Sequence, residues 1–437
     1  MSQLLKKDIK IEHNFKVCIL GVGFVGLTLA IALAKRNIPV IGLDINLELI
    51  QSLNNGETHV IEPNIEEFLQ ETLQSGKLSF RHSSEDLSML KSCNTFILTV
   101  GTPLSGSEIS LGSITNALNQ IIEYISEDDL VILRSTTSVG TANEVVRPIL
   151  NKKSKSISLA MCPERTIEGN AMQEIFHLPQ IIGADDDISL TKATSLFELL
   201  GTEIVKLSSL KSAELAKLVN NTYRDLMFGF ANEIAAFCQK IKIPASEIIH
   251  AANYNYPRSN ISLPGPSGGP CLEKDPWILV QSGKQYDVEL SITKSARQVN
   301  ENSVLHLLDP YFISEVSEKV LLLGLSFKGT PEILDARGSF AKNVIDFIKY
   351  RNPLAEITGY EPAGIFKYDF IDIVQSQSIQ EAISGADKIL ILTNSLKFVD
   401  LEELINKLAD RNCLVIDYWQ VAKPAFLSKE MRYLSWS

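Results

Sequence analysis

Short runs of apolar residues recur along the first 200 positions of the chain, and stretches with helical spacing of apolar residues separate them. The strand-like runs are residues 16–20, 38–44, 95–100, 129–135 and 156–163. Strands that alternate with helical stretches are typical of a parallel sheet with helices on both faces. The pattern therefore predicts an α/β domain in the first half of the chain.

The pattern changes near Leu210, where one helical period continues without a break. Within residues 211–241, apolar side chains recur every three or four positions, at Ala216, Val219, Tyr223, Met227, Phe230, Ile234 and Cys238. That spacing predicts one long amphipathic helix with an apolar face. Helical patterns continue to about residue 309, interrupted by a loop at 263–277 that is rich in glycine and proline.

Strand-like runs return in the last third, at 319–326, 356–362, 387–393 and 412–418, with helical stretches such as 339–351 and 401–410 between them. They predict a second, smaller α/β domain. The expected architecture is an α/β domain at 1–207, an all-α domain with the long helix at 208–309, and a smaller Rossmann-like α/β domain at 310–437.

Composition excludes several classes of function. The net charge is -11 with no basic stripe, which argues against nucleic acid as a partner. No apolar run is long enough to span a membrane, and the first 16 residues lack the apolar core of a secretion signal, so we expect a cytoplasmic protein. Six cysteines form no CxxC pair and six histidines show no ligand spacing, so we expect neither disulfides nor a bound metal.

A glycine-rich turn comes directly after the first strand. Gly21, Gly23 and Gly26 form a GxGxxG pattern before a helix that begins near Phe24 and Val25, and the next strand ends at Asp44. Such glycines let a pyrophosphate rest on a helix N-terminus, while the acid accepts hydrogen bonds from ribose hydroxyls. No arginine occurs among the residues directly after Asp44, in the stretch DINLE at 44–48, which favours NAD over NADP. The alternative is a glycine-rich turn in some other α/β fold.

Hydroxyl groups lie at the ends of two further strands of the predicted sheet. Thr102 ends one strand, and Ser135, Thr136 and Thr137 end the next. The carboxyl edge of a parallel sheet is where ligands bind, so these groups are candidates for the cofactor site. The alternative is ordinary capping of the next helices.

Two acids come after the strand at 156–163. Glu164 and Glu168 lie in the motif CPERTIEG, where a carboxylate could hold or deprotonate a water molecule. The alternative for Glu164 is a surface acid paired with Arg165, and for these residues alone we regard it as the better interpretation.

Lys217 and Asn221 are four residues apart on the long helix and project from one face. A lysine and an amide side by side suit a developing oxyanion, and losing one such donor costs about 2.7–4 kcal/mol in the transition state. The alternative is a solvated helix face.

Cys271 is the one cysteine that lies in a loop instead of an apolar pattern, and Lys274 and Asp275 are close to it in sequence. A thiolate near a cation is an activated nucleophile. The alternative is a half-buried loop thiol without a chemical role.

Together these segments resemble the UDP-glucose/GDP-mannose dehydrogenase family of nucleotide-sugar 6-dehydrogenases. The shared motifs are GVGFVG with Asp44, VGTP, the Ser135–Thr136 pair, CPERxxEG, the helix from 214, PGPSGGPCLEKDPW and GLSFKGTPEILDARGS. The resemblance covers nearly the whole chain. It implies a two-step oxidation of a sugar C6 alcohol to a carboxylate with two NAD+ per turnover, in polysaccharide biosynthesis, by a homodimer joined through the central helical domain.

The resemblance also assigns roles to residues. It implies that Cys271 attacks the C6 aldehyde and carries a thiohemiacetal and then a thioester. It implies that Lys217 and Asn221 stabilise oxyanions. The resemblance implies that Asp275 and Thr136 position a water that Glu164 helps to activate. Its implied cofactor contacts are Gly21, Gly23, Phe24, Val25, Gly26, Asp44, Thr102, Ser135, Thr136, Glu168 and Lys274. Its implied contacts with the UDP-sugar are Glu164, Arg165, Lys217, Asn221, Arg258, Gly268, Lys328 and Arg337, with Arg258 reaching across the dimer.

The chain departs from the family's usual pattern after Thr102–Pro103, where Leu111 and Gly112 stand in place of an acid before a helix. The CPER form resembles the branch that acts on UDP-N-acetylhexosamines, above all UDP-N-acetyl-D-mannosamine, with UDP-glucose and UDP-N-acetylglucosamine as alternatives. Two other hypotheses stay open: a one-step hydroxyacid dehydrogenase, which needs no Cys271, and a sensor of NAD or nucleotide sugar without enzymatic activity.

Overall fold

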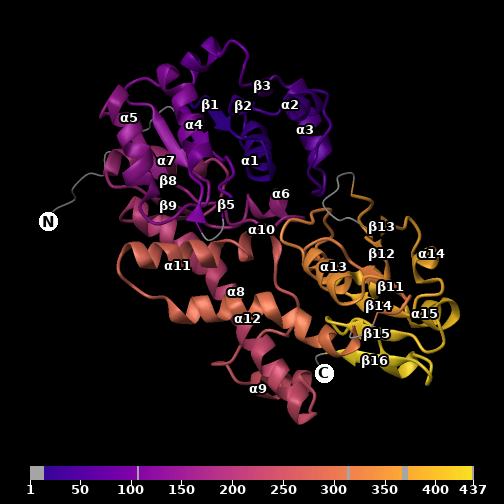
Figure 1. Ribbon diagram of the computed structural model, residues 1–437. Coiled ribbons are helices and arrows are strands. Elements are labelled where there is room, and N and C mark those ends of the chain that lie inside the picture. Colours follow the sequence, from indigo (N-terminus) through magenta and orange to yellow (C-terminus); the bar gives the residue numbers. More distant parts are fainter. Residues whose placement is uncertain (1–13, 106–107, 313–314, 367–372, 436–437) are drawn as a thin grey trace. The chain divides into compact units, whose positions relative to one another are not determined.

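A computed structural model describes residues 14–105, 108–312, 315–366 and 373–435 of the chain (Figure 1). The fold divides into two compact units, one of residues 1–105 and 109–217 and the other of residues 106–108 and 218–437. The division falls within one long helix, between Lys217 and Leu218. The predicted boundaries at 207 and 309 stay a prediction.

The first unit is built on an eight-stranded sheet, in the order β10-β9-β8-β7-β4-β1-β2-β3. Six of these strands, read from β3 to β8, have the order of a dinucleotide-binding fold and pair in parallel. The strands are β1 (Val17–Leu20), β2 (Val40–Asp44), β3 (Leu78–His82), β4 (Thr95–Leu98), β7 (Leu130–Leu133), β8 (Ser158–Met161), β9 (Gln180–Gly183) and β10 (Ile204–Leu207).

Both faces of this sheet are covered, as the continuous apolar runs predict. In β1, Val17 and Ile19 join one buried cluster while Cys18 and Leu20 join another, because successive side chains point to opposite faces. The surrounding helices are α1 (Phe24–Lys35), α2 (Leu47–Asn54), α3 (Ile65–Gln74), α4 (Gly112–Ile121), α5 (Arg147–Lys153), α6 (Ala171–Glu174) and α7 (Asp187–Glu198), with the shorter η1 (Ser88–Ser92), η2 (Ile122–Tyr124) and η3 (Ala142–Val146). The predicted α/β fold with a Rossmann-type sheet is confirmed.

Two strands extend the sheet beyond β8, and the sequence pattern did not predict them. β9 pairs antiparallel with β8 at Met161 and Gly183, and β10 lies parallel to β9 at the edge. Gly183 is required there, because a Cβ atom would come within 2.2 Å of the carbonyl oxygen of Ser209. Two short strands, β5 (Leu104–Ser105) and β6 (Glu108–Ile109), come after β4.

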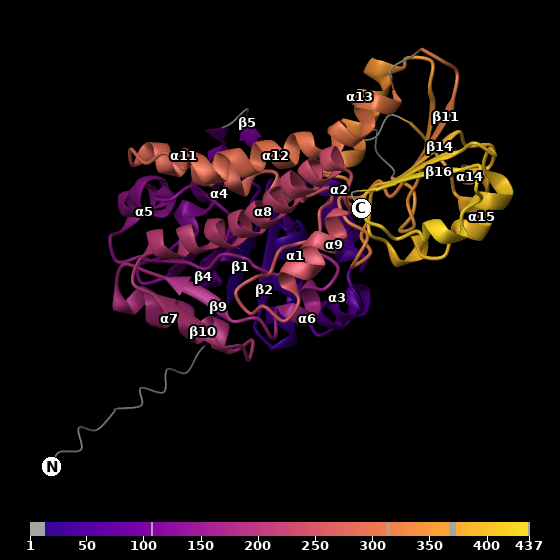
Figure 2. The same cartoon turned by 90° about the horizontal axis from the view of Figure 1, so that it is seen from below.

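The predicted long helix is confirmed as α8 (Leu210–Ile241). After it come α9 (Ala245–Asn253), α10 (Gly269–Leu272), α11 (Asp275–Gln285), α12 (Ser291–Leu308) and the one-turn η4 (Asp309–Tyr311). Figure 2 shows α8 and α12 side by side, and hydrogen bonds between their side chains join them.

Part of the apolar face of α8 is exposed within this chain. Val219, Tyr223 and Phe230 are exposed, at 47%, 60% and 47%, while Asn221 and Asp225 of the same helix are buried. The apolar spacing does mark the helix, but the helix also buries several of its polar side chains.

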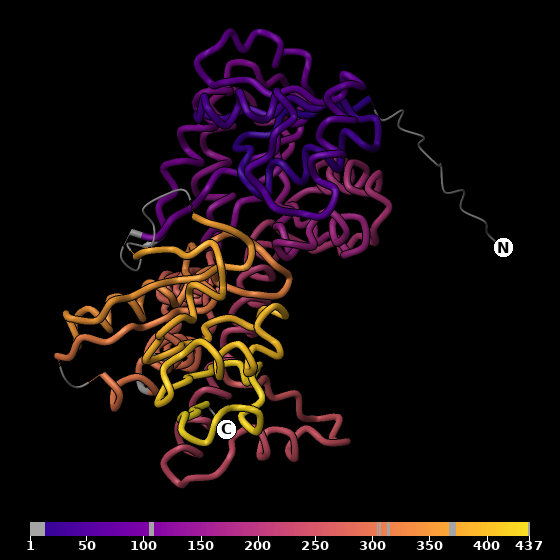
Figure 3. The backbone as a smooth tube through the Cα atoms, turned by 90° about the vertical axis from the view of Figure 1, so that its right-hand side faces the viewer, coloured from indigo at the N-terminus to yellow at the C-terminus, as the bar shows by residue number. Residues whose placement is uncertain are grey.

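The second α/β part holds a six-stranded sheet in the order β13-β12-β11-β14-β15-β16, in which every pair is parallel. Figure 3 traces the backbone of this part in orange to yellow. Its strands are β11 (Lys319–Leu323), β12 (Glu356–Tyr360), β13 (Val374–Gln375), β14 (Lys388–Ile391), β15 (Leu414–Asp417) and β16 (Arg432–Ser435). Its helices are α13 (Phe340–Arg351), α14 (Ile379–Ile383) and α15 (Glu402–Leu408), with η5 (Leu396–Phe398) and η6 (Pro424–Phe426). Val320 and Leu322 face one buried cluster and Leu321 and Leu323 another, so this sheet is also covered on both faces.

Candidate active site

The turn after β1 is shaped by two of its three glycines. Gly21 has a φ of 90°, a left-handed conformation that favours glycine, and its N–H donates to the carbonyl of Leu43 at 2.8 Å. Gly26 lies inside α1, where a Cβ atom would come within 1.9 Å of the Gly21 carbonyl oxygen. The first turn of α1 therefore packs directly on the end of β1, which brings the helix N-terminus to the edge of the sheet.

The same turn fits a dinucleotide. A Cβ atom at Gly23 would meet nothing within 4 Å, so the backbone at the start of α1 borders open space that a pyrophosphate can approach. Phe24 and Val25 are the first two residues of the helix. The half-buried carboxylate of Asp44 accepts hydrogen bonds from Val22 N at 2.8 Å and Asn46 N at 3.0 Å, which fixes it at the end of β2. These features fit NAD at this turn.

Side-chain hydroxyls connect the segments that come directly after β4 and β7 by hydrogen bonds. Thr102 Oγ1 donates to the Thr136 carbonyl at 2.6 Å, and Ser135 Oγ donates to the Val100 carbonyl at 2.7 Å. Neither side chain caps a helix, so the capping alternative does not describe these two groups. Thr137 is buried next to them. The predicted cofactor contacts of Thr102, Ser135 and Thr136 stay a prediction.

Glu164 lies in a buried ion pair that the sequence pattern did not predict. Its Oε2 accepts from Arg134 Nε at 3.1 Å and from Arg134 Nη2, and its Oε1 accepts from the backbone N–H groups of Arg165 at 2.7 Å and Thr166 at 2.8 Å. Burial alone would raise the pKa of Glu164, but Arg134 and these amides outweigh burial and lower it. Glu164 is therefore a carboxylate with both oxygens engaged, and its proposed part in activating water stays a prediction.

Arg134 was not identified from the sequence as the partner of Glu164. Its side chain is 1% exposed and also donates to the Cys162 carbonyl at 3.1 Å and to Gln180 Oε1 at 3.3 Å, so it ties β7 to β8 and β9. A signal was present in the sequence, because an arginine directly after the apolar run 130–133 must be paired if the strand is buried.

Glu62 and Glu214 are two further buried acids that anchor loops of the first unit. Glu62 accepts from Ala171 N at 2.8 Å and from Gly169 N, and so holds the loop that carries the predicted cofactor contact Glu168. Glu214 accepts from Gly140 N at 2.6 Å and Ala142 N at 2.8 Å, and burial raises its pKa to about 7. Their backbone partners are distant in sequence, so no local pattern marked either acid. Arg165 donates to the Pro179 carbonyl.

Lys217 and Asn221 are both buried at 7% exposure, so the alternative of a solvated helix face is wrong for them. Asn221 Nδ2 donates to Asp275 Oδ2 at 2.6 Å, which brings together two predicted site residues that are 54 positions apart. Asp275 is the first residue of α11 and is 1% exposed, while Lys274 is the N-cap of that helix. The amide of Asn221 and the carboxylate of Asp275 thus form one buried polar pair.

Cys271 lies in α10, a single helical turn within the predicted loop, and it is exposed, whereas the other five cysteines are buried. The glycines before it allow a close approach to residues 327–340. Gly269 N donates to the Gly338 carbonyl at 2.8 Å, a Cβ atom at Gly268 would lie 2.3 Å from that oxygen, and one at Gly269 would lie 2.5 Å from the Phe327 ring. The glycine-rich stretch is therefore closely packed where the thiol is presented.

The predicted nucleotide-sugar contacts Lys328 and Arg337 lie on the segment that packs against this glycine stretch. The Lys328 ammonium lies 5.6 Å from the centre of the Phe327 ring, and Arg337 pairs with Asp335 at 2.5 Å. Arg258 lies after α9 in the chain and donates to the Tyr256 hydroxyl at 2.8 Å and 3.0 Å. The contacts of these cations with a substrate stay a prediction.

The segment that departs from the family's usual pattern holds β5, β6 and the start of α4. Gly112 is the first residue of α4, and Leu111 at its N-cap offers no side-chain acceptor to the first turn. Residues 106 and 107 of this segment lie outside the described residues. The missing acid is therefore a missing helix cap, a loss that is typically worth about 1 kcal/mol.

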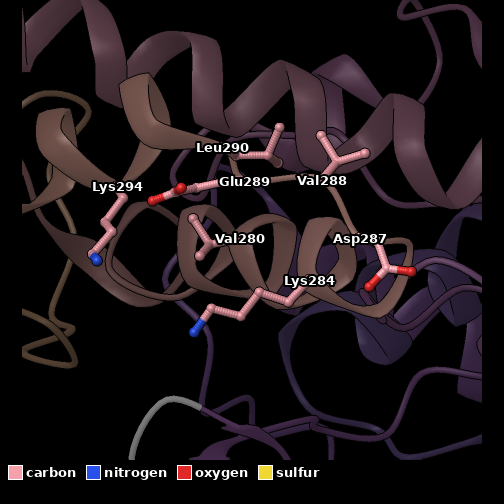
Figure 4. A pocket seen from close by; sticks show the side chains of 7 residues that line it. All are labelled: Val280, Lys284, Asp287, Val288, Glu289, Leu290 and Lys294. Carbon is pink, nitrogen blue, oxygen red and sulfur yellow. The ribbon is translucent and has the colours of Figure 1, made fainter.

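A cavity of about 310 Å³ lies where α11 ends and α12 begins (Figure 4). It is lined by Val280, Lys284, Asp287, Val288, Glu289, Leu290 and Lys294, none of which is a predicted site residue. Among the described residues, no helix is both long enough and apolar enough to cross a membrane.

Comparison with known proteins gives consistent matches along the chain. Residues 15–200 match the NAD-binding domain, and residues 211–302 the central domain, of the UDP-glucose/GDP-mannose dehydrogenase family. The UDP-N-acetyl-D-mannosamine dehydrogenase of Pyrococcus horikoshii is 32% identical over 93% of this chain and 96% of its own length.

Solved structures agree with these matches. A structure of the UDP-D-ManNAc dehydrogenase of P. horikoshii covers 96% of this chain and 99% of its own, with a TM-score of 0.84 and 29% identity. The UDP-N-acetyl-mannosamine dehydrogenase Cap5O of Staphylococcus aureus covers 96% of this chain and 98% of its own, with a TM-score of 0.82 and 27% identity. The chain belongs to the UDP-glucose/GDP-mannose dehydrogenase family and is an NAD-dependent nucleotide-sugar dehydrogenase.

Proposed function

We propose that this enzyme oxidises the C6 hydroxyl of UDP-N-acetyl-D-mannosamine to a carboxylate. The observation that carries the proposal is the similarity to the P. horikoshii enzyme of that specificity, which extends over 93% of this chain. NAD+ supplies the hydride acceptor for both oxidations when it is bound at the turn after β1. The remaining chemistry falls to side chains of the protein.

In the first oxidation the C6 alcohol loses a hydride and a proton and becomes an aldehyde. Lys217 and Asn221 are the donors for the oxygen on which negative charge develops. Their burial supports this role, because a donor shielded from water stabilises charge far more than an exposed one.

The second oxidation runs through Cys271. Its sulfur forms a bond to the aldehyde carbon, the π bond of the carbonyl opens, and the thiol proton passes to the carbonyl oxygen, which gives a thiohemiacetal. Loss of a second hydride and of the hydroxyl proton turns this adduct into a thioester. Exposure of Cys271 in the turn of α10 supports the role of nucleophile, and covalent attachment keeps the aldehyde from escaping.

Hydrolysis completes the reaction: water adds to the thioester carbon, the C–S bond breaks, and the sulfur recovers its proton. Asp275, held by Asn221 at 2.6 Å, positions the water together with Thr136. Glu164 is ionised and fully engaged, so in this proposal it orders the loop at 164–166 and the water beside it, and it accepts a proton only if its contact with Arg134 opens.

The nucleotide part of the substrate is assigned to cations of the second unit. Lys328 and Arg337 bind the diphosphate, because they flank the segment that packs against Gly268 and Gly269. Arg258 reaches the substrate of a second subunit. We place this chemistry in the cytoplasm, where reducing conditions keep a nucleophilic thiol reduced.

A homodimer through the central helices is part of the proposal. α8 and α9 expose apolar side chains, among them Tyr223 and Phe237 at 60% and 61%, and Tyr254 directly after α9 is exposed at 67%. Exposed apolar patches of this kind mark protein interfaces. Tyr223→Lys combined with Phe237→Lys is expected to yield monomers in light scattering, and a double variant that stays dimeric argues against this surface.

The test of function is an NADH assay with UDP-N-acetyl-D-mannosamine, UDP-N-acetylglucosamine, UDP-glucose and GDP-mannose in parallel. We expect the highest kcat/KM with UDP-N-acetyl-D-mannosamine and two NADH per sugar. A yield of one NADH per sugar from the unaltered enzyme would favour a one-step dehydrogenase, and no turnover with any of the four would favour a sensor.

The covalent route is tested with Cys271→Ser. The variant retains the first oxidation and stalls before the acid, so we expect aldehyde and about one NADH per sugar. Full uronate production by Cys271→Ser would rule out the thioester.

A further inference from the structure

Four buried polar side chains lie between α8 and α12 and form one connected network. Asp225 and Asn232 come from α8, and Arg297 and Asn300 come from α12, and each is at most 2% exposed. Arg297 Nη1 donates to Asp225 Oδ1 at 2.6 Å, Asn300 Nδ2 donates to the same oxygen at 2.9 Å, and Asn232 Nδ2 donates to Asn300 Oδ1 at 2.9 Å. The seam between these helices is therefore polar in its centre.

This network binds the backbone of the loop that carries Cys271. At one end, Asn232 accepts from Gly265 N at 2.8 Å and donates to the Gly265 carbonyl at 3.1 Å. Nearer the thiol, Arg297 donates to the Ser267 carbonyl at 3.3 Å and to the Leu272 carbonyl at 3.0 Å. One guanidinium thus holds a carbonyl on each side of Cys271.

A buried arginine at this place is costly unless every contact is made, because a charge taken out of water must be paired. Asp225 supplies the opposite charge at 2.6 Å, and Glu301 lies 3.5 Å from Nε. The cavity beside Arg297 measures about 20 Å³ and is lined in part by Ser267 and Glu273, which leaves room for about one water molecule. The Ser267 carbonyl therefore has the guanidinium as its partner, with little water beside it.

We propose that Arg297 is a positioning residue for the nucleophile: it fixes the loop so that the Cys271 sulfur is held at one place for attack on the aldehyde. The catalytic consequence rests on the proposed function, whereas the fixing of the loop does not. Because Cys271 enters only after the first oxidation, loss of Arg297 must slow the second oxidation and leave the first largely intact.

The test compares Arg297→Met and Arg297→Lys with the unaltered full-length enzyme. Methionine removes every donor, and a lysine ammonium retains the charge opposite Asp225 but cannot span both carbonyls. We expect hydrogen exchange of the amides in 265–272 to accelerate in both variants, more in Arg297→Met. Misplacement of about 1 Å costs on the order of 100-fold in rate, so we expect the second oxidation to fall by about that factor in Arg297→Met and about 10-fold in Arg297→Lys.

The control is Lys388→Met, which removes a half-buried ion pair of the same unit, Lys388 with Glu318 at 2.5 Å. Among the described residues, Lys388 donates to the Tyr311 carbonyl and to Glu318 and not to the loop. It is expected to lower the free energy of unfolding, with two NADH still formed per sugar. Both Arg297 variants are expected to release aldehyde and to form fewer than two NADH per sugar.

Two results would overturn the proposal: unchanged exchange of 265–272 in a folded Arg297 variant, or a second oxidation that is slowed no more than in Lys388→Met. If Arg297→Met does not fold, Arg297→Lys decides by the same two measurements. If no sugar is turned over by the unaltered enzyme, the proposed function fails, and the exchange rates still decide whether Arg297 fixes the loop.

Discussion

In both sheets of this enzyme a glycine with positive φ comes after the first strand and an acid lies at the end of the second strand, but the segments that follow the glycine differ. Gly21 comes directly after β1 with a φ of 90°, and Gly324 directly after β11 with a φ of 89°. In both sheets an acid at the end of the next strand accepts the N–H of the residue after the glycine: Asp44 from Val22 at 2.8 Å, and Glu361 from Leu325 at 2.8 Å. The strand orders also agree. In each sheet the second strand pairs with the first, and the third strand pairs with the second on the same side.

The two sheets differ in the segment after the glycine. In the first sheet α1 begins at Phe24, so a helix N-terminus stands at the sheet edge, and Asp44 is only half-buried. In the second sheet no helix begins until Phe340, and Glu361 is 5% exposed and accepts from three backbone amides. The same turn therefore leads into a helix that suits a phosphate in one sheet, and into a long loop with Lys328 and Arg337 in the other.

The largest effect is expected from Gly26→Ala, because its Cβ would meet the Gly21 carbonyl oxygen at 1.9 Å and push α1 away from β1. Displacement of the helix N-terminus weakens several charged hydrogen bonds to the pyrophosphate, each worth about 1.5–3 kcal/mol, so we expect NAD+ affinity to fall by at least about 100-fold in calorimetry. Gly324→Ala is the matched variant, with its Cβ 2.1 Å from Thr393 Oγ1. It should destabilise the protein and leave NAD+ affinity unchanged; equal losses of affinity would mean that the two turns are not separate in function.

The next effect concerns the free energy of unfolding, and here the change in the second sheet is expected to be larger than the change in the first. Glu361→Ala leaves buried amides of Leu325 and Ser326 without an acceptor, which should cost about 3 kcal/mol of the free energy of unfolding. Asp44→Ala exposes its amides to solvent and should cost about 1 kcal/mol or less. Urea titration measures both, and a larger loss in Asp44→Ala would contradict the assignment of Glu361 as the structural acid.

A smaller effect is expected on cofactor choice. Asp44→Ala removes an ionised acceptor for the ribose hydroxyls, so NAD+ affinity should fall by about 10- to 100-fold, the equivalent of about 1.5–3 kcal/mol for a charged hydrogen bond. The discrimination against NADP+ should relax, because the carboxylate no longer repels a 2′-phosphate. An unchanged ratio of the two affinities would argue against the ribose contact.

The smallest effect is a dependence of stability on pH. Burial raises the pKa of Glu361 in the folded protein above its ordinary value of 4.5, although the amides of Leu325, Ser326 and Ala363 oppose the rise. A raised pKa in the folded state means that this group's contribution to stability is highest below 4.5 and declines as the pH rises through the folded pKa. Glu361→Gln should reduce this decline in the free energy of unfolding, measured by urea titration from about pH 4 to about pH 7. If the unaltered enzyme instead gains stability over Glu361→Gln as the pH rises, the pKa of Glu361 is not raised.

Much of the fold was predictable because its signals are local. Residues such as Val17 and Leu20 lie in short apolar runs, and the glycines of the turn after β1 mark a left-handed conformation and a close approach. Most of the strands that were missed are short or lie at edges: β13 has two residues, and β16 mixes polar and apolar side chains. β9 is an exception, because it lies between β10 and β8. An edge strand needs only one covered face, and so it leaves a weak pattern.

The orientation of α8 could not be predicted from its period. Periodicity shows that Val219, Tyr223 and Phe230 share a face, but it does not show whether this chain or another protein covers that face. The covered part of the helix carries Asn232 because a loop backbone lies against it, and Asp225 because Arg297 and Asn300 lie against it. Arg297 was missed for the same reason, since its partners are 72 and 25 positions away.

The polar seam between α8 and α12 also has a consequence for synthesis. A ribosome completes residue 271 before it reaches residue 297, so in the proposed mechanism the growing chain carries its nucleophilic sulfur for a time without the arginine that holds the backbone around it. The thiol can take its working place only after α12 has been made and has docked. Activity is thereby withheld from unfinished polypeptides.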